Sequence, residues 1–485
     1  MKLLRKLQHS WDFWFLLVTS FVFFLLRLPS FFEPYWYGDE GVYEVLGFGM
    51  RHGRLLYQGI WDNKPPLLYL IYALFDGNQP YVRVFSFVVG LTALYFFFAL
   101  SKRLFESKRA IYLATAFFAI FLGLPLVEGN IANAENFMVL PAVVSVYLLV
   151  KSVQEKRYSL ATLFSIGLLL GISFIIKIVA VFDFAALIIV VGFVVLAWNK
   201  KAVLSFVEKA FFLCIGFILP FLATVGFFAY KGILKVFFQS AFLSNVGYVN
   251  YGNQFIIPQG FLILKLLLLA IVILILLVKR KSFSFTQQVV YILLPFALFD
   301  AFFSGRPYTH YMLVMLTAMS LLAGFVLEKK WRIVHACLLV LLALLLYKNF
   351  WFYGKTTAYY GNFAQFVMGT KTVSEYQSFF DKGVPRDYAI AAFLSLPSNK
   401  NKSIYLWTNS AQDYYLIQKL PIGRYTVAYH ATMTPAMLLE TSIALSKNPP
   451  DILVILPNAP EFPFHMTHYR LRESITGGAI YERTF

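Results

Sequence analysis

The sequence predicts a polytopic α-helical membrane protein with about eleven transmembrane helices and a small extracytoplasmic α/β domain at its C-terminus. Of the 485 residues, 59% are hydrophobic and only 14% are charged, and the mean hydropathy is +0.68. Soluble domains carry about a quarter charged residues. Apolar windows recur between residues 11 and 350, each near the roughly 20 residues that cross the hydrocarbon core of a bilayer.

Eleven apolar segments are the candidate transmembrane helices. They lie near residues 12–28, 81–100, 110–126, 133–150, 158–176, 178–197, 208–229, 259–278, 286–303, 309–327 and 332–350. The bulky residues Arg27, Leu28, Phe31 and Phe32 stand where a signal peptide needs a small-residue cleavage site, so we expect an uncleaved first span. The only two cysteines, Cys214 and Cys337, fall within predicted spans, and neither a disulfide framework nor a metal-thiolate site is expected.

Basic clusters occupy every second loop between these segments. They comprise Lys2/Arg5/Lys6, Lys102/Arg103/Lys108/Arg109, Lys151/Lys156/Arg157, Lys200/Lys201, Lys279/Arg280/Lys281 and Lys329/Lys330/Arg332. Because basic loops stay on the cytoplasmic side, we expect the N-terminus inside and the other loops outside, together with the tail after residue 350. The net charge of +18 then reflects topology and contacts with anionic headgroups, so nucleic-acid binding is not expected.

The sequence divides into a transmembrane domain at residues 1–350 and a soluble extracytoplasmic domain at residues 351–485. The long first loop of the transmembrane domain, residues 29–80, is rich in apolar residues and suits short helices lying at the membrane interface. Pro65-Pro66 cannot continue a preceding helix, so they fix a corner in this loop.

The tail shows alternating strand and helix patterns. The strand patterns lie at residues 403–407 and 451–456, and the helix patterns lie at residues 388–394, 414–420 and 435–445. This alternation predicts a small α/β domain. No glycine-rich phosphate fingerprint follows either strand, so a cytosolic type of nucleotide site is not expected.

Ionisable and amide side chains gather in the predicted extracytoplasmic loops and at the outer ends of the spans. They are Asp39, Glu40, Asp62, Lys64, Arg83, Glu128, Asn130, Asn133, Glu135, Lys177, Arg306 and His310. A charged group in hydrocarbon costs about 2.5–3.5 kcal/mol or more unless it is paired or faces water. Their accumulation on one face therefore predicts a functional site there.

The acids of this set are candidates for catalysis. Asp39 and Glu40 end the first span within a run of aromatic residues. Asp39 can act as a general base toward an acceptor hydroxyl, or hold a divalent cation together with Glu135. Two solvated loop acids, and a structural salt bridge at Glu135, are the alternatives. Candidates for lining the substrate pocket are Tyr43, Asp62, Asn133 and Tyr308.

The basic residues of the set are candidates for binding a departing phosphate. They are Lys64, Arg83, Arg306 and His310. Arg binds phosphate through paired hydrogen bonds and Lys as a point charge. Alternatives remain for three of them. Lys64 can snorkel to lipid headgroups, Arg83 can anchor a span at the interface, and His310 can be a satisfied helix histidine or a metal ligand.

Four short motifs and one single residue occur in order between residues 38 and 311. They are Gly38-Asp39-Glu40 with Tyr43, Lys64-Pro65-Pro66, Arg83, Ala134-Glu135-Asn136-Phe137, and Gly305-Arg306-Pro307-Tyr308-Thr309-His310-Tyr311. In this combination the chain resembles the GT-C membrane glycosyltransferases, in particular the bacterial glycosyltransferase family 39. That group includes protein O-mannosyltransferases and the transferases that add aminoarabinose to lipid A. The chain departs from the family pattern at two places. Asn63 stands where some relatives carry a metal-binding acid, and Glu135 lies in an asparagine-rich stretch.

The resemblance implies a polyprenyl-phosphate-linked sugar donor and inverting transfer to a lipid, glycan or protein acceptor. It implies an integral protein of a bacterial or archaeal plasma membrane, with its active site at the outer surface. Asp39 would be the base or the cation holder, and Lys64 would bind the lipid phosphate. A divalent metal is the one cofactor that the resemblance raises. The soluble tail would cover the site or control acceptor access.

Functions of other classes are also compatible with a polytopic membrane protein. A transporter or flippase for polyprenyl-linked glycan precursors is the main alternative, but it predicts paired internal repeats and binding groups near the bilayer midplane. The sequence shows neither feature. A polymerase or ligase of another fold would use diphosphate-linked oligosaccharides. A membrane scaffold without catalytic activity is the third alternative, and it does not explain the converging acids and cations.

Overall fold

The computed structural model describes residues 11–195, 200–246, 261–328, 331–465 and 467–484. The basic residues expected at Lys2/Arg5/Lys6 and Lys329/Lys330 lie outside the described residues, as do residues 196–197 and 259–260 of two predicted spans. The chain forms two compact units. The first comprises Met1–Leu28, Arg83–Gly232 and Leu243–Thr356, and the second Pro29–Val82, Ile233–Phe242 and Thr357–Phe485.

The second unit combines the first loop with the tail. Residues 29–82, expected as part of the transmembrane domain, pack into the same compact unit as residues 357–485. The division drawn from the sequence at residue 350 separates the predicted spans and their loops from the tail that follows the last span, and the packing of the chain does not test it. That division stays a prediction.

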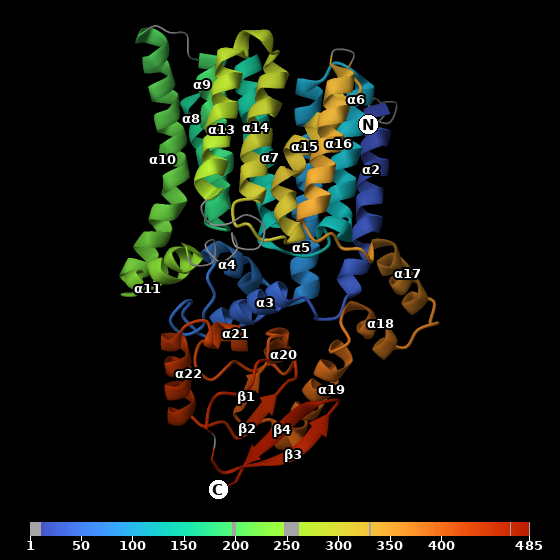
Figure 1. Cartoon of the computed structure of the whole chain (residues 1–485), viewed down its shortest axis with the longest axis vertical. Helices are drawn as coiled ribbons and strands as arrows, with labels where there is room; N and C mark the ends of the chain where they lie inside the picture. The colour runs from blue at the N-terminus through green and yellow to red at the C-terminus, as the bar shows by residue number, and fades with distance from the viewer. Residues whose placement is uncertain (1–10, 196–199, 247–260, 329–330, 466, 485) are drawn as a thin grey trace, which may run out of the picture. The chain divides into compact units, whose positions relative to one another are not determined.

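The first unit is a bundle of apolar helices (Figure 1). It contains α2 (Trp11–Arg27), α5 (Gln79–Leu104), α6 (Lys108–Gly123), α7 (Ala134–Gln154), α8 (Leu160–Phe174), α9 (Val181–Val195), α10 (Lys200–Tyr230), α13 (Phe261–Val278), α14 (Phe285–Ala301), α15 (Leu316–Phe325) and α16 (Arg332–Asn349). Each predicted span coincides with one of them. Within the described residues, seven helices are long and apolar enough to cross a membrane and three are shorter and apolar. The helical membrane fold class is confirmed, and eleven crossings remain a prediction.

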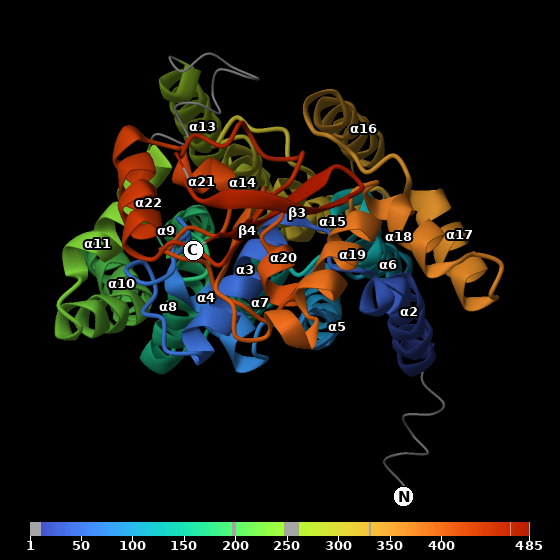
Figure 2. The same cartoon turned by 90° about the horizontal axis from the view of Figure 1, so that it is seen from below.

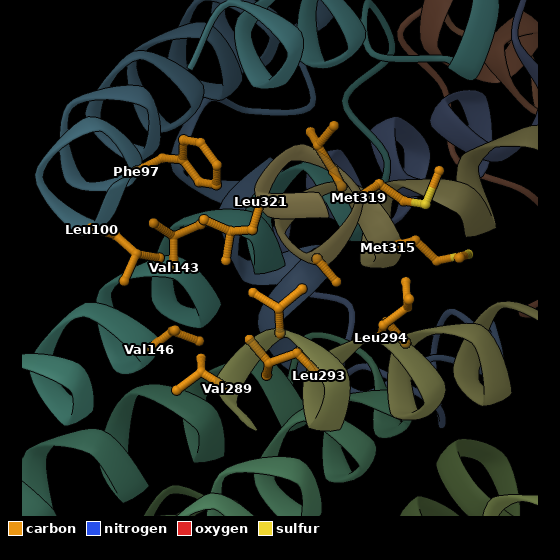
Figure 3. Close-up of a cluster of buried hydrophobic side chains, with 14 of the residues drawn as sticks. Phe97, Leu100, Val143, Val146, Val289, Leu293, Leu294, Met315, Met319 and Leu321 are labelled. Carbon is orange, nitrogen blue, oxygen red and sulfur yellow. The ribbon is translucent and has the colours of Figure 1, made fainter. Parts of the chain in front are cut away.

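Apolar side chains from several helices meet inside this bundle. Figure 3 shows Phe97 of α5, Val143 of α7, Leu293 of α14 and Leu321 of α15 among the buried residues that converge there. By contrast, α13 has no buried residue, so its apolar surface suits contact with lipid chains. Gly167 of α8 faces the backbone of α10 with no room for a Cβ. The absence of a side chain there lets the two helices approach closely.

The second unit contains short helices and a small sheet. Its helices are α3 (Gly38–Arg51), α4 (Pro66–Leu74), α11 (Leu234–Phe238), α17 (Thr356–Val367), α18 (Val373–Phe380), α19 (Val384–Leu394), α20 (Gln412–Leu416), α21 (Ala428–Ala431) and α22 (Pro435–Lys447). The strand order is β1-β2-β4-β3. β1 (Ile404–Trp407) runs parallel to β2 (Ile452–Ile455), and β4 (Gly478–Arg483) is antiparallel to both β2 and β3 (Tyr469–Ile475). Figure 2 shows β3 beside β4.

The predicted α/β character of the tail is confirmed, because strands lie at both predicted positions and helices alternate with them. The β3–β4 hairpin was not predicted. Thr476 and Gly477 form its turn, and both have a positive φ, 46° and 83°. A two-residue turn of this kind matches the twist of the strands that it joins.

Candidate active site

Helix α3 separates the two neighbouring acids of the first loop. Asp39 and Glu40 both lie in its first turn, where the helix dipole favours negative charge. Successive helical side chains point in different directions, and only Asp39 reaches solvent, with 38% of its side chain exposed. Glu40 is buried. Of the two predicted catalytic acids, Asp39 is therefore the accessible one.

Lys64 lies between two carboxylates. Its Nζ is 3.7 Å from Asp39 Oδ2 and 3.9 Å from Asp62 Oδ2, and it lies 4.8 Å from the ring centroid of Tyr43. The Tyr43 hydroxyl donates a hydrogen bond to Asp39 Oδ2 (3.1 Å), and the Tyr69 hydroxyl donates one to Asp62 Oδ2 (2.7 Å). We call Asp39, Asp62 and Lys64 the shared-lysine cluster.

Two buried tyrosines hold the backbone of Lys64. The Tyr57 hydroxyl donates to the Lys64 carbonyl at 2.7 Å, and the Lys64 amide donates to the Tyr69 hydroxyl at 3.0 Å. Burial, together with the charge of Asp62, raises the pKa of both tyrosines well above the usual value. They therefore stay neutral donors at physiological pH. Pro65 follows directly and α4 begins at Pro66, so the predicted corner at Lys64 is present.

His430 joins this cluster from α21. Its Nε2 is 3.7 Å from Asp62 Oδ1, and its ring packs edge-on against Trp61, with centroids 5.0 Å apart. Burial, with a further contribution from Lys64, lowers the pKa of His430 to about 4, although Asp62 and Asp39 oppose the shift. The imidazole is therefore neutral at physiological pH. Sequence analysis missed this residue, because a single histidine in the tail carries no pattern.

A second set of charged groups lies in the first unit. Lys177 forms a salt bridge with Glu135 Oε1, at the start of α7, and its Nζ lies 4.2 Å from the ring centroid of Tyr311. His310 Nδ1 is 2.8 Å from Glu128 Oε2. Only 2% of the Glu135 side chain is exposed. We call Glu135 and Lys177 the buried pair.

The other predicted residues of the first unit lie near this pair or on neighbouring segments. Asn133 Nδ2 donates to Glu128 Oε2 at 3.4 Å. Arg306 Nη1 donates to the Tyr308 hydroxyl at 3.5 Å, and the ring of Tyr308 lies parallel to that of His310 at 5.8 Å. Arg83 lies on α5 and is buried. Its role in phosphate binding stays a prediction.

The carboxylates expected to hold a divalent cation each have a lysine ammonium as partner. Asp39 shares Lys64 with Asp62, and Glu135 pairs with Lys177. Within the described residues, no group of three or more His, Cys, Asp or Glu side chains could hold a metal ion. The ammonium of Lys64 already neutralises Asp39 and occupies the place beside it that a cation would take. These residues therefore fit a metal ion poorly. A metal at Asp39 and Glu135 stays a prediction.

Comparisons with known proteins agree with this architecture. Residues 64–228 match the family model described as dolichyl-phosphate-mannose-protein mannosyltransferase. No curated protein matches the sequence. The structure is similar to that of ArnT from Cupriavidus metallidurans bound to undecaprenyl phosphate, with 14% identity, 97% of each chain covered and a TM-score of 0.54. It is also similar to the archaeal oligosaccharyltransferase AglB from Archaeoglobus fulgidus in complex with an inhibitory peptide and a dolichol-phosphate. That likeness has 10% identity, 92% of this chain and 70% of that chain covered, and a TM-score of 0.50.

The structural likeness is one of fold, because the identities are low. The chain resembles the GT-C membrane glycosyltransferases, as its motifs predicted. The matched region begins at Lys64 and includes Arg83, Glu135 and Lys177.

Proposed function

We propose that the protein is an integral membrane glycosyltransferase. It moves a monosaccharide from a polyprenyl phosphate to an acceptor hydroxyl on the extracytoplasmic side, with inversion at the anomeric carbon. The shared-lysine cluster carries the proposal, because a partly exposed carboxylate and a buried one share a single ammonium. The GT-C fold, the family match, and the lipid phosphates bound to the two similar structures support it.

Asp39 acts as the general base in this proposal. It accepts the proton of the acceptor hydroxyl while the acceptor oxygen attacks the anomeric carbon. The new carbon–oxygen bond forms as the bond between the anomeric carbon and the phosphate oxygen breaks. The electron pair of that bond leaves with the lipid phosphate, and the ammonium of Lys64 stabilises the resulting negative charge.

Because Asp39 and Asp62 share Lys64, proton transfer to Asp39 is coupled to the stabilisation of the departing phosphate. When Asp39 takes the proton it becomes neutral, so Lys64 loses one of its two carboxylate partners as the phosphate gains charge. Asp62 is 4% exposed and hydrogen-bonded to Tyr69, so it keeps the ammonium in place. His430 is neutral at physiological pH and does not compete for the phosphate.

The groups of the first unit have supporting roles in this proposal. Arg83, Arg306 and His310 remain the predicted phosphate ligands. Glu135 is held by Lys177, so we assign it a structural or positioning role. No step passes through a metal ion.

The test uses the purified protein in lipid nanodiscs. Mass spectrometry first identifies the polyprenyl lipid that co-purifies, and transfer is then measured with the sugar-linked form of that lipid. Asp39→Asn and Lys64→Ala should each abolish transfer without loss of folding. The matched control is the exposed pair Asp12 and Lys102, whose atoms lie 2.6 Å apart in the first unit. Asp12→Asn and Lys102→Ala should leave turnover unchanged.

Wild-type turnover by Asp39→Asn or Lys64→Ala would refute the assignment. Movement of the lipid across the bilayer without sugar transfer would favour a flippase instead.

A further inference from the structure

The second unit contains a cavity of about 330 Å³ at the carboxyl ends of the two parallel strands. Asn409 and Ser410, which follow β1, line it together with Asn458, which follows β2. Ligands of α/β proteins bind at the carboxyl ends of parallel strands, and ligand sites have volumes of about 300–1,000 Å³. None of the residues of the shared-lysine cluster lines this cavity. The cavity is therefore distinct from the shared-lysine cluster and lies where the fold class binds ligands.

The polar groups of the wall are held in fixed positions. Asn458 Nδ2 donates to Ser410 Oγ, and Asn409 Nδ2 donates to the Asn458 carbonyl, both at 2.8 Å. Gln412 also lines the cavity and is 3% exposed. Its Oε1 has no hydrogen-bond partner among the described residues. This oxygen is buried against α3, 2.3 Å from where a Cβ on Gly41 would lie, so Gln412 fixes the wall to α3 and its Oε1 is not offered to a ligand.

Gly38 forms another part of the wall, and the fold itself does not require a glycine there. Its φ is not among the positive values, and a Cβ added to it would meet no heavy atom within 4 Å. A larger side chain at this position would occupy open space at the wall, so residue 38 is a place where the cavity can be blocked.

The charges of the cavity favour a neutral ligand over an anion. Arg386 is its only cation in the described lining, against the carboxylates of Asp381 and Asp387. The guanidinium is already engaged, since its Nε and Nη2 donate to Asp387 Oδ1 at 2.9 and 2.7 Å. Trp36 adds an aromatic surface. Amides, a hydroxyl and an indole ring together suit a ligand with many hydroxyl groups and apolar C–H faces.

We infer that this cavity binds a saccharide unit of the acceptor. The inference rests on the proposed function, because Gly38 directly precedes Asp39 in the first turn of α3. A saccharide held against Gly38 lies beside the turn that carries the proposed base. The cavity then selects the acceptor, and the shared-lysine cluster performs the transfer.

The test measures binding to the full-length protein in nanodiscs by saturation-transfer NMR. The probes are the methyl glycosides of glucose, mannose and galactose, with inorganic phosphate as the anionic comparison. At least one glycoside should bind, and Gly38→Phe should weaken its binding at least tenfold. The matched control is Gly361→Phe, since Gly361 of α17 is also helical and also has open space at its Cβ position. This control should bind like wild type. Trp36→Ala, which removes the aromatic surface of the lining, is the second variant if Gly38→Phe does not fold, and it should weaken binding as well.

Absence of glycoside binding, binding that neither variant changes, or phosphate binding that Gly38→Phe removes would each overturn the inference. Turnover separates this result from the proposed function. The KM for the acceptor should rise at least tenfold in Gly38→Phe while the KM for the donor stays constant. Glycoside binding that depends on Gly38, in a protein without transferase activity, would refute the proposed function and leave the saccharide site standing. Transfer by a protein whose acceptor KM is unaffected would refute the saccharide site alone.

Discussion

The buried pair and the shared-lysine cluster both join lysine to carboxylate, but their surroundings differ. In the buried pair the side chains of Glu135 and Lys177 are 2% and 15% exposed. In the cluster, Lys64 and Asp39 are 21% and 38% exposed, and Lys64 has a second partner in Asp62. One ammonium therefore has a single buried partner, and the other is shared between a partly exposed carboxylate and a buried one.

This difference indicates which of the two can perform chemistry. Separating a buried pair leaves a charge in a medium that solvates it poorly, which costs about 3–5 kcal/mol. An exposed pair contributes about 0–1 kcal/mol and can exchange partners. The cluster can therefore release Lys64 to a phosphate, whereas the buried pair fixes the start of α7 to the segment after α8.

The largest expected effect is on turnover, at Asp39. Asp39→Asn removes the proposed base, so the rate of sugar transfer should fall by about 10²–10⁴-fold. The thermal stability should hardly change, because the side chain is partly exposed. Transfer assays and thermal unfolding of the same preparation check both parts. A large loss of stability with the activity retained would show that Asp39 has a structural role and is not the base, which would contradict the assignment of the chemistry to the shared-lysine cluster.

Lysine removal should separate the two sites in stability. Lys177→Met leaves the Glu135 carboxylate buried without its ammonium, so the free energy of unfolding should fall by about 3–5 kcal/mol. Lys64→Met should cost less than Lys177→Met, because Asp39 reaches solvent and Asp62 keeps the hydrogen bond from the Tyr69 hydroxyl. Reversible unfolding in mixed detergent compares the variants. Equal losses would show that burial does not distinguish them.

Tyr69→Phe tests whether the Tyr69 hydroxyl positions the groups of the shared-lysine cluster. The substitution removes the hydroxyl that bonds both Asp62 and the amide of Lys64, and a hydrogen bond to a charged group contributes about 1.5–3 kcal/mol. We expect a lower rate and a higher KM for the lipid donor, with the fold retained. Tyr72→Phe on the same helix is the comparison. An effect of Tyr69→Phe on stability alone would contradict a positioning role.

The smallest effect concerns pH and His430. Its pKa is about 4 in the folded protein and 6.5 in the unfolded chain, so between these values the unfolded state binds the additional proton. The contribution of the neutral imidazole to the free energy of unfolding is complete above pH 6.5. It is lost as the pH falls toward 4, by about 1.4 kcal/mol per pH unit. Asp62, Asp39 and Lys64 are the charged groups that act on it. His430→Gln should show a shallower loss of stability between pH 6.5 and 5, and an identical slope would contradict a buried neutral imidazole.

Much of the fold was predictable, because long apolar segments bounded by basic clusters are a strong local signal. Asp39 and Lys64 also stood out as candidates, since paired acids after a span and a Lys-Pro-Pro corner are short patterns, and their roles stay predictions. His430 was not, because its contact with Asp62 joins residues that are far apart in the chain. The β3–β4 hairpin was missed although Thr476-Gly477 is a recognisable turn.

The packing of residues 29–82 with the tail was equally beyond the sequence. Apolar residues in the first loop indicated short helices at an interface, but apolar composition alone does not distinguish a lipid surface from a protein one. The burial of Glu40 was unpredictable for the same reason. Helix periodicity shows that Glu40 and Asp39 point in different directions, but it does not show which side of the helix is covered.

The affinity for the lipid phosphate, measured in the cluster variants, tests the central claim most directly. If Asp39 and the phosphate share Lys64, Asp39→Asn should bind the polyprenyl phosphate at least as tightly as wild type while transfer is lost. Lys64→Ala should weaken binding at least tenfold. Native mass spectrometry in nanodiscs measures both affinities. Unchanged binding in Lys64→Ala, or weaker binding in Asp39→Asn, would contradict the account.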